Sequence, residues 1–200
     1  MHSQSEPLLI VISGPSGAGK DSVIKAMQKR GLPIHFVVTA TSRARRPNEV
    51  EGVDYLFVTR QRFEEMIAND ELIEHAVVYG EYKGVPRQQV MEALASGKDV
   101  VLRVDVQGAL TLRKQFPKAV LIFLSAEDLQ EIAARLENRS TEEAEELRRR
   151  LDTAQWELEH LCDFDYWVVN RRGQLEQTVD ILMAIIQAEH HRICRQRGLP

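Results

Sequence analysis

Residues 14–20, Gly-Pro-Ser-Gly-Ala-Gly-Lys, have the types and spacing of a phosphate-binding loop. They follow the apolar run at residues 8–12 and precede a helix-like stretch at residues 21–30. Glycines let the main chain curl so that several N–H groups point at one anion. The helix adds the positive end of its dipole, and Lys20 adds a mobile charge for the outer phosphates. In this strand–turn–helix context the motif predicts a nucleoside triphosphate site, whereas the alternative is a chance glycine-rich turn.

The position after Lys20 departs from the usual pattern of such loops. Most of them carry Ser or Thr there, whose hydroxyl ligates Mg²⁺, but this chain has Asp21 followed by Ser22. A carboxylate is itself a hard oxygen ligand for Mg²⁺. An acid in the first helical turn also suits the helix dipole, which is the simpler interpretation. We expect Asp21 to fill both roles, at the helix start and near a magnesium ion.

Composition and charge narrow the class of protein. At 200 residues and 44% hydrophobic content, the chain predicts one globular domain with room for small inserted lobes, and no apolar run approaches transmembrane length. The polar N-terminus has no signal-peptide core, so we expect a cytoplasmic protein. Cys162 and Cys194 lack metal-ligand spacing and are expected to stay reduced. The net charge of −4 argues against a nucleic-acid partner, while arginine clusters at residues 43–46 and 148–150 indicate local anion sites.

Apolar runs that alternate with amphipathic stretches predict the sheet that positions these residues. We expect strands over residues 8–12, 35–40, 99–105, 119–124 and 166–170, and helices over residues 21–30, 107–115, 129–137 and 175–191. Continuous apolar strands between helices are typical of a parallel sheet covered on both faces. Ligands of such sheets bind at the carboxyl ends of the strands, where Gly14, Asp105 and Asn170 fall.

Two segments interrupt this alternation. Residues 41–86 combine short strand-like pieces, a helical stretch at residues 60–69 and several turn residues, which predicts a small inserted α+β lobe. Residues 137–150 are rich in charge, with helix signals from residue 141 onward. The spacing of Glu145 and Arg149 fits a solvated helix with i,i+4 ion pairs. A lid that carries arginines to the phosphates is the functional alternative, and the sequence leaves both open.

Several stretches, in order, resemble the guanylate kinase family from residue 8 to about residue 190. They are the phosphate-binding loop, TSRARRPNEVEGVDY at residues 41–55, ELIEHA at 71–76, VDVQG at 104–108 and RLENR at 135–139. Together these motifs are specific, whereas the loop alone is shared by very many NTPases. The resemblance implies an α/β enzyme with a three-layer P-loop kinase fold, built on a central parallel sheet. Its parts would be a core (residues 1–40, 87–136 and 151–200), an inserted GMP-binding lobe (41–86) and a helical lid (137–150).

The resemblance also implies a reaction and the residues for it. The reaction is transfer of the γ-phosphoryl of ATP to GMP or dGMP, with Mg²⁺ as cofactor, in purine nucleotide metabolism. For ATP we expect Gly14, Pro15, Ser16, Gly17, Ala18, Gly19, Lys20, Asp21, Ser22 and Asn170. For GMP we expect Thr39, Arg43, Arg46, Tyr55, Glu74, Lys83 and Asp105. The expected catalytic residues are Lys20, Arg43, Arg135, Arg139 and Arg150, and the expected metal ligands are Asp21 and Asp105.

Elementary chemistry supports these acceptor-site roles. Arg43 and Arg46 present planar guanidinium groups that suit a phosphate dianion. Tyr55 resembles the tyrosine of the family whose hydroxyl also binds that phosphate. Glu74 resembles the carboxylate that reads guanine, because the N1–H and exocyclic amine of guanine are adjacent donors that adenine lacks. An unpaired buried carboxylate is costly, so such a residue discriminates strongly. Each assignment has a simpler alternative. Arg43 and Arg46 could belong to a basic surface turn, Tyr55 could be a core residue, and Glu74 could be a polar residue on an edge strand.

Asp105 and Asn170 also have simpler alternatives. Asp105 ends a predicted core strand and could cap the helix that follows it. Asn170 follows a strand, where Asn is a common turn residue. Arg135, Arg139 and Arg150 resemble lid arginines that stabilise charge on the transferred group.

Three positions depart from the family pattern. Lys83 replaces the tyrosine expected before Gly84, and Val85 replaces the hydroxyl expected after it. We hypothesise that Lys83 donates to the guanine carbonyl oxygen or approaches the phosphate. Arg103 stands where many members have an acid, so it lies near the phosphates or pairs with Asp21.

Two other functions remain as alternatives. The Gly-Lys-Asp-Ser sequence also resembles ribose bisphosphate kinases, but a ribose phosphate offers Glu74 no donor pair. A non-catalytic peptide-binding module of the guanylate kinase type is disfavoured by the intact Lys20 and loop glycines. We expect ATP and GMP as partners, with neither nucleic acid nor membrane, and the sequence gives no basis for an oligomeric state.

Overall fold

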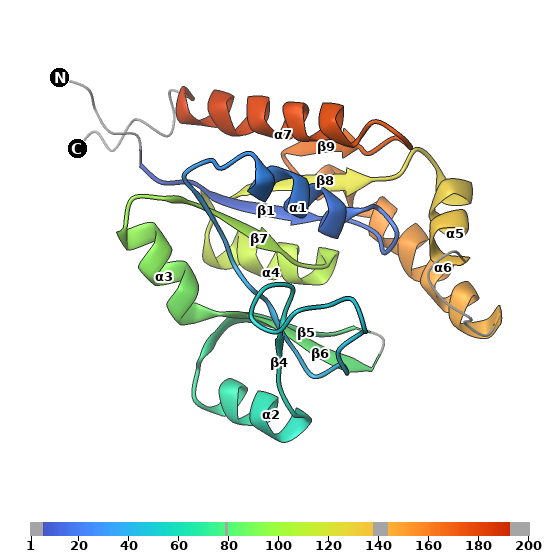
Figure 1. Cartoon of the computed structure of the whole chain (residues 1–200), viewed down its shortest axis with the longest axis horizontal. Coiled ribbons are helices and arrows are strands. Elements are labelled where there is room, and N and C mark those ends of the chain that lie inside the picture. Colours follow the sequence, from blue (N-terminus) through green and yellow to red (C-terminus); the bar gives the residue numbers. More distant parts are fainter. Residues whose placement is uncertain (1–5, 79, 138–143, 193–200) are drawn as a thin grey trace.

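The chain folds around a five-stranded parallel sheet (Figure 1). The computed structural model describes residues 6–78, 80–137 and 144–192. In sheet order, the strands are β2 (Ile34–Phe36), β7 (Asp99–Arg103), β1 (Leu9–Ser13), β8 (Val120–Ser125) and β9 (Tyr166–Val169). All four pairings are parallel, with Ile10 opposite Val101 on one side and Val120 on the other. The carboxyl ends of these strands therefore meet at one edge.

Helices cover both faces of this sheet, as the sequence predicts. The helices α1 (Lys20–Lys29) and α7 (Leu175–His190) pack on one face, and α3 (Arg87–Ala95) and α4 (Val106–Gln115) pack on the other (Figure 1). Within β1, Ile10 joins the core beneath α1 and α7, whereas Val11 joins the core beneath α3 and α4. A strand buried on both faces is apolar along its length, which explains residues 9–12 of β1, and the strand ends at the buried polar residue Ser13. The predicted three-layer α/β fold is confirmed.

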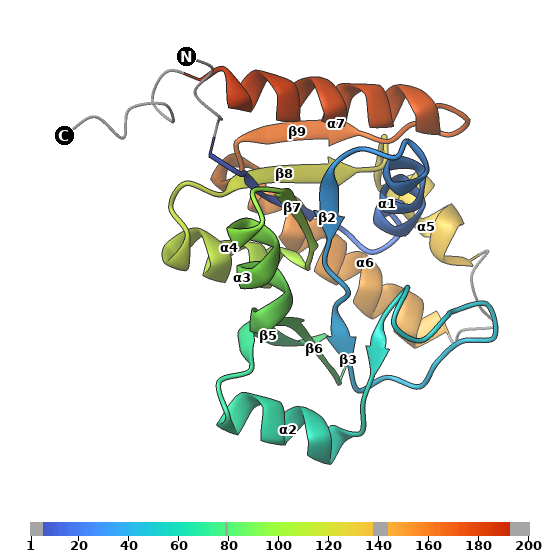
Figure 2. The same cartoon turned by 60° about the vertical axis from the view of Figure 1, so that its left-hand side comes forward.

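A smaller four-stranded sheet lies to one side of the parallel sheet, as Figure 2 shows. Its strands, in sheet order, are β4 (Leu56–Phe57), β3 (Ala40–Thr41), β6 (Glu81–Pro86) and β5 (Leu72–Val78). Strands β5 and β6 form an antiparallel hairpin, and α2 (Arg60–Ala68) follows β4. Phe63 of α2 is fully buried and stacks on Tyr82 of β6, with ring centroids 4.9 Å apart. This lobe thus has a small core of its own.

The prediction of a single strand over residues 35–40 is wrong. Strand β2 ends at Phe36, and the next strand, β3, begins at Ala40 in the other sheet. Between them the Gln89 side chain accepts from the Val38 N–H at 3.1 Å and donates to the Val38 carbonyl at 3.4 Å. Because these bonds satisfy the peptide groups of Val38, no sheet partner is needed there, and the chain crosses from the large sheet into the small one.

Two further helices lie beside the phosphate-binding loop. These are α5 (Leu129–Glu137) and α6 (Ala144–Glu159), which pack together through Ile132 and Ala154, and a short 3₁₀ helix, η1 (Leu161–Asp163), follows. Helix α6 continues past residue 150, where the predicted lid segment ends. Arg139 lies outside the described residues, as does the side chain of Arg150. Within the described ranges, no helix combines the length and apolar character needed to cross a bilayer.

Candidate functional site

The phosphate-binding loop joins β1 to α1 through main-chain conformations that require glycine at two positions. Gly14 has φ 132°, and a Cβ there would lie 1.9 Å from the carbonyl oxygen of Leu124. Gly19 has φ 90°, and a Cβ there would lie 2.4 Å from the amide nitrogen of Asn170. Only glycine avoids both the positive-φ cost and these collisions. The loop can therefore turn tightly at the end of β1 and present the N-terminus of α1.

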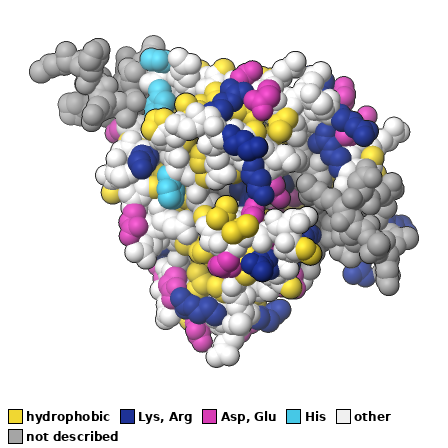
Figure 3. Space-filling model, viewed as in Figure 1, with side chains coloured by type: hydrophobic (Ala, Val, Ile, Leu, Met, Phe, Trp, Pro, Cys, Tyr) yellow, Lys and Arg dark blue, Asp and Glu magenta, His cyan; other side chains and the backbone are white. Residues whose placement is uncertain are grey.

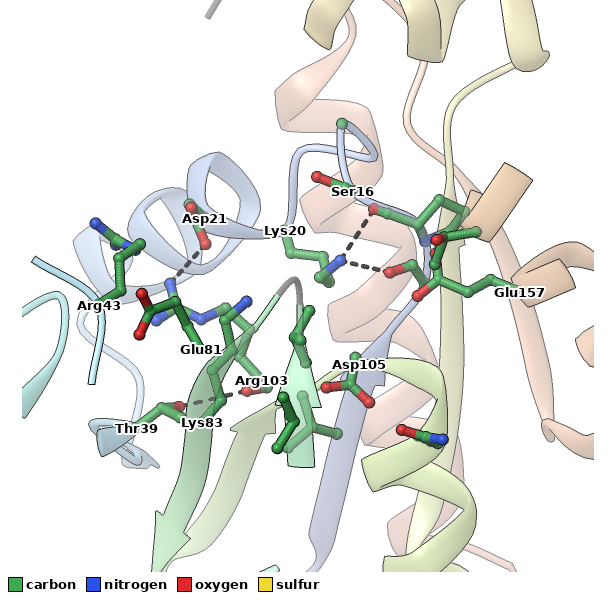
Figure 4. Close-up of a pocket in the computed structure, with 18 of the residues that line it drawn as sticks. Ser16, Lys20, Asp21, Thr39, Arg43, Glu81, Lys83, Arg103, Asp105 and Glu157 are labelled. Carbon is green, nitrogen blue, oxygen red and sulfur yellow. Dashed lines mark hydrogen bonds and ion pairs between the residues drawn. The ribbon is translucent and has the colours of Figure 1, made fainter. Parts of the chain in front are cut away.

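Lys20, the first residue of α1, folds back over this loop. Its ammonium group donates to the carbonyl oxygens of Gly14 at 2.5 Å and Pro15 at 3.0 Å (Figure 4). Burial lowers the pKa of Lys20, and the carboxylate of Glu157 opposes that shift. A buried ammonium that donates to carbonyl groups gains from a nearby anion, so the arrangement suits phosphate oxygens.

A cavity of about 600 Å³ separates the loop from the smaller sheet. The following predicted residues line it: Gly14, Pro15, Ser16, Gly17, Gly19, Lys20, Asp21, Thr39, Arg43, Arg46, Tyr55, Glu74, Lys83 and Asp105. Residues that sequence reasoning did not assign also line it: Glu81, Gln107, Thr153, Trp156 and Glu157. Figure 4 shows charged side chains from both sheets pointing into this one space. Segments far apart in the sequence thus converge on a single polar cavity.

A loop of the smaller lobe carries the predicted guanidinium pair. Arg43 forms an ion pair with Glu49 at 2.7 Å, and the Arg46 main-chain N–H donates to the same carboxylate at 2.9 Å. Arg43 also lies over the ring of Tyr55, 5.3 Å from its centroid. Burial raises the pKa of the Tyr55 phenol, which therefore stays a neutral hydroxyl. Glu49 orders the loop so that both arginines reach the cavity.

Glu74, on β5, is the buried acid of the cavity. It is 5% exposed, and its Oε1 has no hydrogen-bond partner among the described residues. Burial, and then the charge of Asp105, raises the pKa of Glu74 to about 8. The carboxyl packs against Gly108 of α4, where a Cβ would lie 2.7 Å from it. An acid that remains buried without a partner is costly to the fold, which is typical of a group reserved for a ligand.

Lys83 and Glu157 add two more buried ionisable groups. Burial, and then the positive charge of Lys20, lowers the pKa of Lys83 on β6 to about 8. Burial raises the pKa of Glu157 on α6 to about 7, while Lys20 opposes that shift. The Oε2 of Glu157 has no partner within the described part of the chain. Sequence reasoning missed Glu157, because an acid within a charge-rich helix looks the same as its solvated neighbours.

The structure resolves two alternatives that the sequence left open. Arg103 pairs with Asp21, with Nη1 2.6 Å from Oδ1, and Thr39 donates to the Arg103 carbonyl at 3.4 Å. Asp105 is the N-cap of α4, and its Oδ1 accepts from the Gly108 N–H at 2.9 Å. The capping alternative for Asp105 is thus correct, and the same side chain also lines the cavity.

A second cavity, of about 410 Å³, also borders the loop and shares Gly17 and Gly19 with the first. Of the predicted residues, it is lined by Gly17, Gly19, Ser22, Arg135 and Asn170. The Nη2 of Arg135 donates to the Asn170 carbonyl at 2.9 Å, and the Asn170 amide donates to the Ala18 carbonyl at 2.9 Å. Arg135 also pairs with Glu131 at 2.7 Å. These bonds attach the loop to α5 and to the residue that follows β9.

Cations gather at the site although the chain is acidic overall. The net charge is −4. Figure 3 nevertheless shows Lys and Arg side chains in a line across the middle of one face, over α1. Lys20, Arg43, Arg46, Lys83 and Arg103 line the first cavity, together with the acids Asp21, Glu74, Glu81, Asp105 and Glu157. The cavity therefore presents positive groups at particular positions among acids, which suits small anions rather than an extended polyanion.

Comparison with known proteins assigns the chain to a family. The guanylate kinase family model matches residues 6–189. The chain belongs to the guanylate kinase family. The rice protein "Guanylate kinase 2, chloroplastic/mitochondrial" is 50% identical over 189 residues, which are 94% of this chain and 66% of that protein. The guanylate kinase of Halalkalibacterium halodurans is 45% identical over 192 residues, covering 96% of this chain and 92% of its own.

A solved guanylate kinase structure shares the fold. The chain is similar to the guanylate kinase from Anaplasma phagocytophilum, with a TM-score of 0.79 and 33% identity, over 98% of this chain and 92% of the other. The family resemblance expected from the motifs is therefore confirmed. The roles of individual site residues, including the departures at Lys83, Val85 and Arg103, stay predictions.

Proposed function

We propose that this member of the guanylate kinase family transfers the γ-phosphoryl of ATP to GMP or dGMP, giving ADP and GDP. The observation that carries the proposal is the position of Glu74. A buried acid, whose Oε1 has no partner among the residues that the structure describes, faces the same cavity as the phosphate-binding loop and the guanidinium pair. Family membership and this geometry support the same reaction.

On the ATP side, the loop amides and Lys20 would hold the phosphates. Lys20 would exchange its carbonyl partners for phosphate oxygens. Arg135 contacts the loop through the Gly17 carbonyl, and we assign to it the neutralisation of charge on the transferred group. We assign the same role to Arg139 and Arg150, and we assign Ser22 and Asn170 to the outer side of the ATP site.

On the acceptor side, Arg43, Arg46 and Tyr55 would bind the phosphate of GMP. The Glu74 carboxylate would accept from the N1–H and the exocyclic amine of guanine. Pairing with two donors favours the charged form, so binding would lower the pKa of Glu74 from about 8. Lys83 would donate to the guanine carbonyl oxygen or to the acceptor phosphate.

The residues present fit a magnesium ion that is shared with the substrate. Asp21 and Asp105 both line the cavity beside Lys20, and since their Oδ1 atoms accept from Arg103 and from the Gly108 N–H, a metal would be held through the other oxygen of each or through water. Mg²⁺ typically binds one or two carboxylates together with phosphate oxygens and water, so two acids are sufficient. Bound Mg²⁺ would supply neutralisation of the negative charge of the phosphates.

Phosphoryl transfer depends on alignment and charge neutralisation more than on covalent participation. The two groups of cations face each other across one cavity, so this chain would align donor and acceptor phosphates between them. Free ATP and GMP as substrates fit the expected cytoplasmic location, with neither nucleic acid nor membrane as a partner.

An acceptor panel tests the proposal. Formation of ADP from ATP is measured with GMP, AMP or ribose 1,5-bisphosphate as the acceptor, and the products are separated by chromatography. We expect turnover with GMP, and GDP as the second product. Turnover with the sugar phosphate alone, or none with any acceptor, would contradict the proposal.

A further inference from the structure

Arg103 lies where the parallel sheet meets the smaller lobe. It is the last residue of β7, the strand next to β1, and its side chain is only 13% exposed. The guanidinium extends toward Asp21 and α1 (Figure 4). Because arginine keeps its charge at any physiological pH, a buried guanidinium requires partners. Both halves of the site supply them.

The first partner belongs to the ATP side. The Nη1 of Arg103 donates to the Oδ1 of Asp21 at 2.6 Å. Asp21 lies in the first turn of α1, directly after Lys20, and its side chain is 43% exposed. The guanidinium is thereby tied to the residue that follows the phosphate-binding lysine.

The second set of partners belongs to the acceptor side. The Nη2 of Arg103 donates to the carbonyl oxygen of Asp54 at 2.9 Å. Its guanidinium carbon lies 4.4 Å from the ring centroid of Tyr55, which is a cation–π distance. Lys25 of α1 forms a further ion pair with Asp54 at 2.6 Å. The loop that presents Tyr55 is therefore attached to both β7 and α1.

The ring of Tyr55 is shared by two guanidinium groups, since Arg43 approaches it at 5.3 Å. Arg43 and Tyr55 are the residues to which we assign the acceptor phosphate. A phosphate bound there would enter the field of Arg103, which Asp21 holds in place. One side chain thus connects the proposed acceptor phosphate site with the first turn of α1.

We propose that Arg103 is a positioning residue that couples the two nucleotide sites, so that a nucleotide at the phosphate-binding loop tightens the binding of GMP. A nucleotide bound at the loop fixes the first turn of α1 and therefore Asp21. A fixed Asp21 holds Arg103 in the orientation that also contacts Asp54 and Tyr55, so the second ligand meets a loop that is already ordered. By linkage, GMP tightens binding at the loop by the same factor. The inference rests on the proposed function, because it requires both sites.

Calorimetric titration with ADP and GMP tests the coupling, because this pair fills both sites without reacting. The Kd for GMP is measured with and without saturating ADP, and the ratio is the coupling factor. We expect a factor of about 5 or more in the unmodified protein. In Arg103→Met, which removes the charge but keeps most of the side-chain length, the ratio should fall close to unity. Arg103→Lys should retain part of the coupling.

A second variant separates coupling from a merely structural role. Arg103→Met leaves the negative charge of Asp21 next to the incoming phosphates, so the Kd for ADP should rise. Adding Asp21→Asn should restore the affinity for ADP but not the coupling factor. Arg62→Met is the matched control, because Arg62 is a 44% exposed residue of the smaller lobe that is likewise paired with an acid, Glu71. It should leave the coupling factor unchanged.

The outcomes are distinguishable. Independent binding of ADP and GMP to the unmodified protein would overturn the inference and leave the proposed function standing. Full coupling in Arg103→Met would overturn it as well. A protein that binds neither nucleotide would contradict the proposed function itself. If Arg103→Met does not fold, as judged by its thermal unfolding, Arg103→Lys decides: undiminished coupling and unchanged ADP affinity would overturn the inference.

Discussion

Replacement of Glu74 by Gln should stabilise the fold and abolish efficient use of GMP. The carboxyl is 5% exposed, and its Oε1 has no partner among the described residues. Burial raises its pKa from the ordinary 4.5 to about 8. Between these values the folded state binds more protons than the unfolded state, so the stability of the unmodified protein falls as the pH rises through this window. Because glutamine does not titrate, the Glu74→Gln protein should not lose stability in this way as the pH rises.

The size of the effect follows from the shift. Integration of the proton linkage from 4.5 to about 8 gives a destabilisation by Glu74 of roughly 3 kcal/mol at pH 7 and roughly 1 kcal/mol at pH 5. Near pH 4 the Glu74 side chain is neutral in the folded protein, as glutamine always is, so the two proteins should have almost the same free energy of unfolding. Glu74→Gln should therefore raise the free energy of unfolding by these amounts. The same variant should lower kcat/KM for GMP by about 100-fold or more, because the amide places a donor against guanine donors.

Urea denaturation at pH 4, 5 and 7, together with ADP formation in the presence of GMP, measures both effects. Glu49→Gln is a control of opposite sign for stability. Although burial opposes it, hydrogen bonds from Arg43 and the Arg46 N–H hold the pKa of Glu49 below its ordinary value, so its loss should destabilise the fold at pH 7. A Glu74→Gln protein with unchanged stability at pH 7, or with full GMP turnover, would refute the reasoning.

Three further substitutions test other parts of the site. Lys83→Ala should raise the KM for GMP about tenfold, which is the loss expected for one charged hydrogen bond. The KM for ATP should change little. An unaltered KM for GMP in steady-state kinetics would refute the role of Lys83. Asp21→Ala should alter the magnesium dependence of turnover more than the affinity for ATP. A titration of turnover with magnesium at fixed ATP checks this, and an unchanged titration curve would refute the metal role of Asp21. Gly108→Ala should weaken GMP binding, because the new Cβ would lie 2.7 Å from the Glu74 carboxyl, and calorimetry that finds unchanged affinity would show that Glu74 has room to move.

Elements specified by short stretches of sequence were predictable. The apolar run of β1 followed by the glycine-rich loop predicts the strand–loop–helix unit, because both the burial and the positive-φ glycines are local requirements. The run over β8 predicts a buried parallel strand for the same reason. The buried strand predicted over residues 99–105 is present as β7, but it ends at Arg103, and Asp105 is instead the N-cap of α4.

Elements that depend on distant contacts were harder to predict. The break between β2 and β3 is set by the side chain of Gln89, which lies 51 residues from Val38 in the sequence. Strand β6 contains Gly84 and Pro86, residues that usually argue against a strand, and it is held by its pairing with β3 and β5. Helix α6 continues because Ala154 packs on Ile132 of α5.

The candidate site shows the same division. Lys20 was predictable from its motif, and Glu74 and the guanidinium pair from their resemblance to the family. The pairing of Arg103 with Asp21 was one of two open alternatives, since the residues are 82 positions apart. Glu157 was missed because only the fold turns it inward.

The most direct test of two facing anion sites with a guanine-reading acid is a crystal structure with ADP and GMP bound. We predict the N1–H and amino nitrogens of guanine within about 3.2 Å of the Glu74 carboxylate. The GMP phosphate should lie between Arg43 and Arg46, and the ADP phosphates on the amides of residues 14–20. A guanine bound elsewhere, with Glu74 still without a partner, would contradict the account.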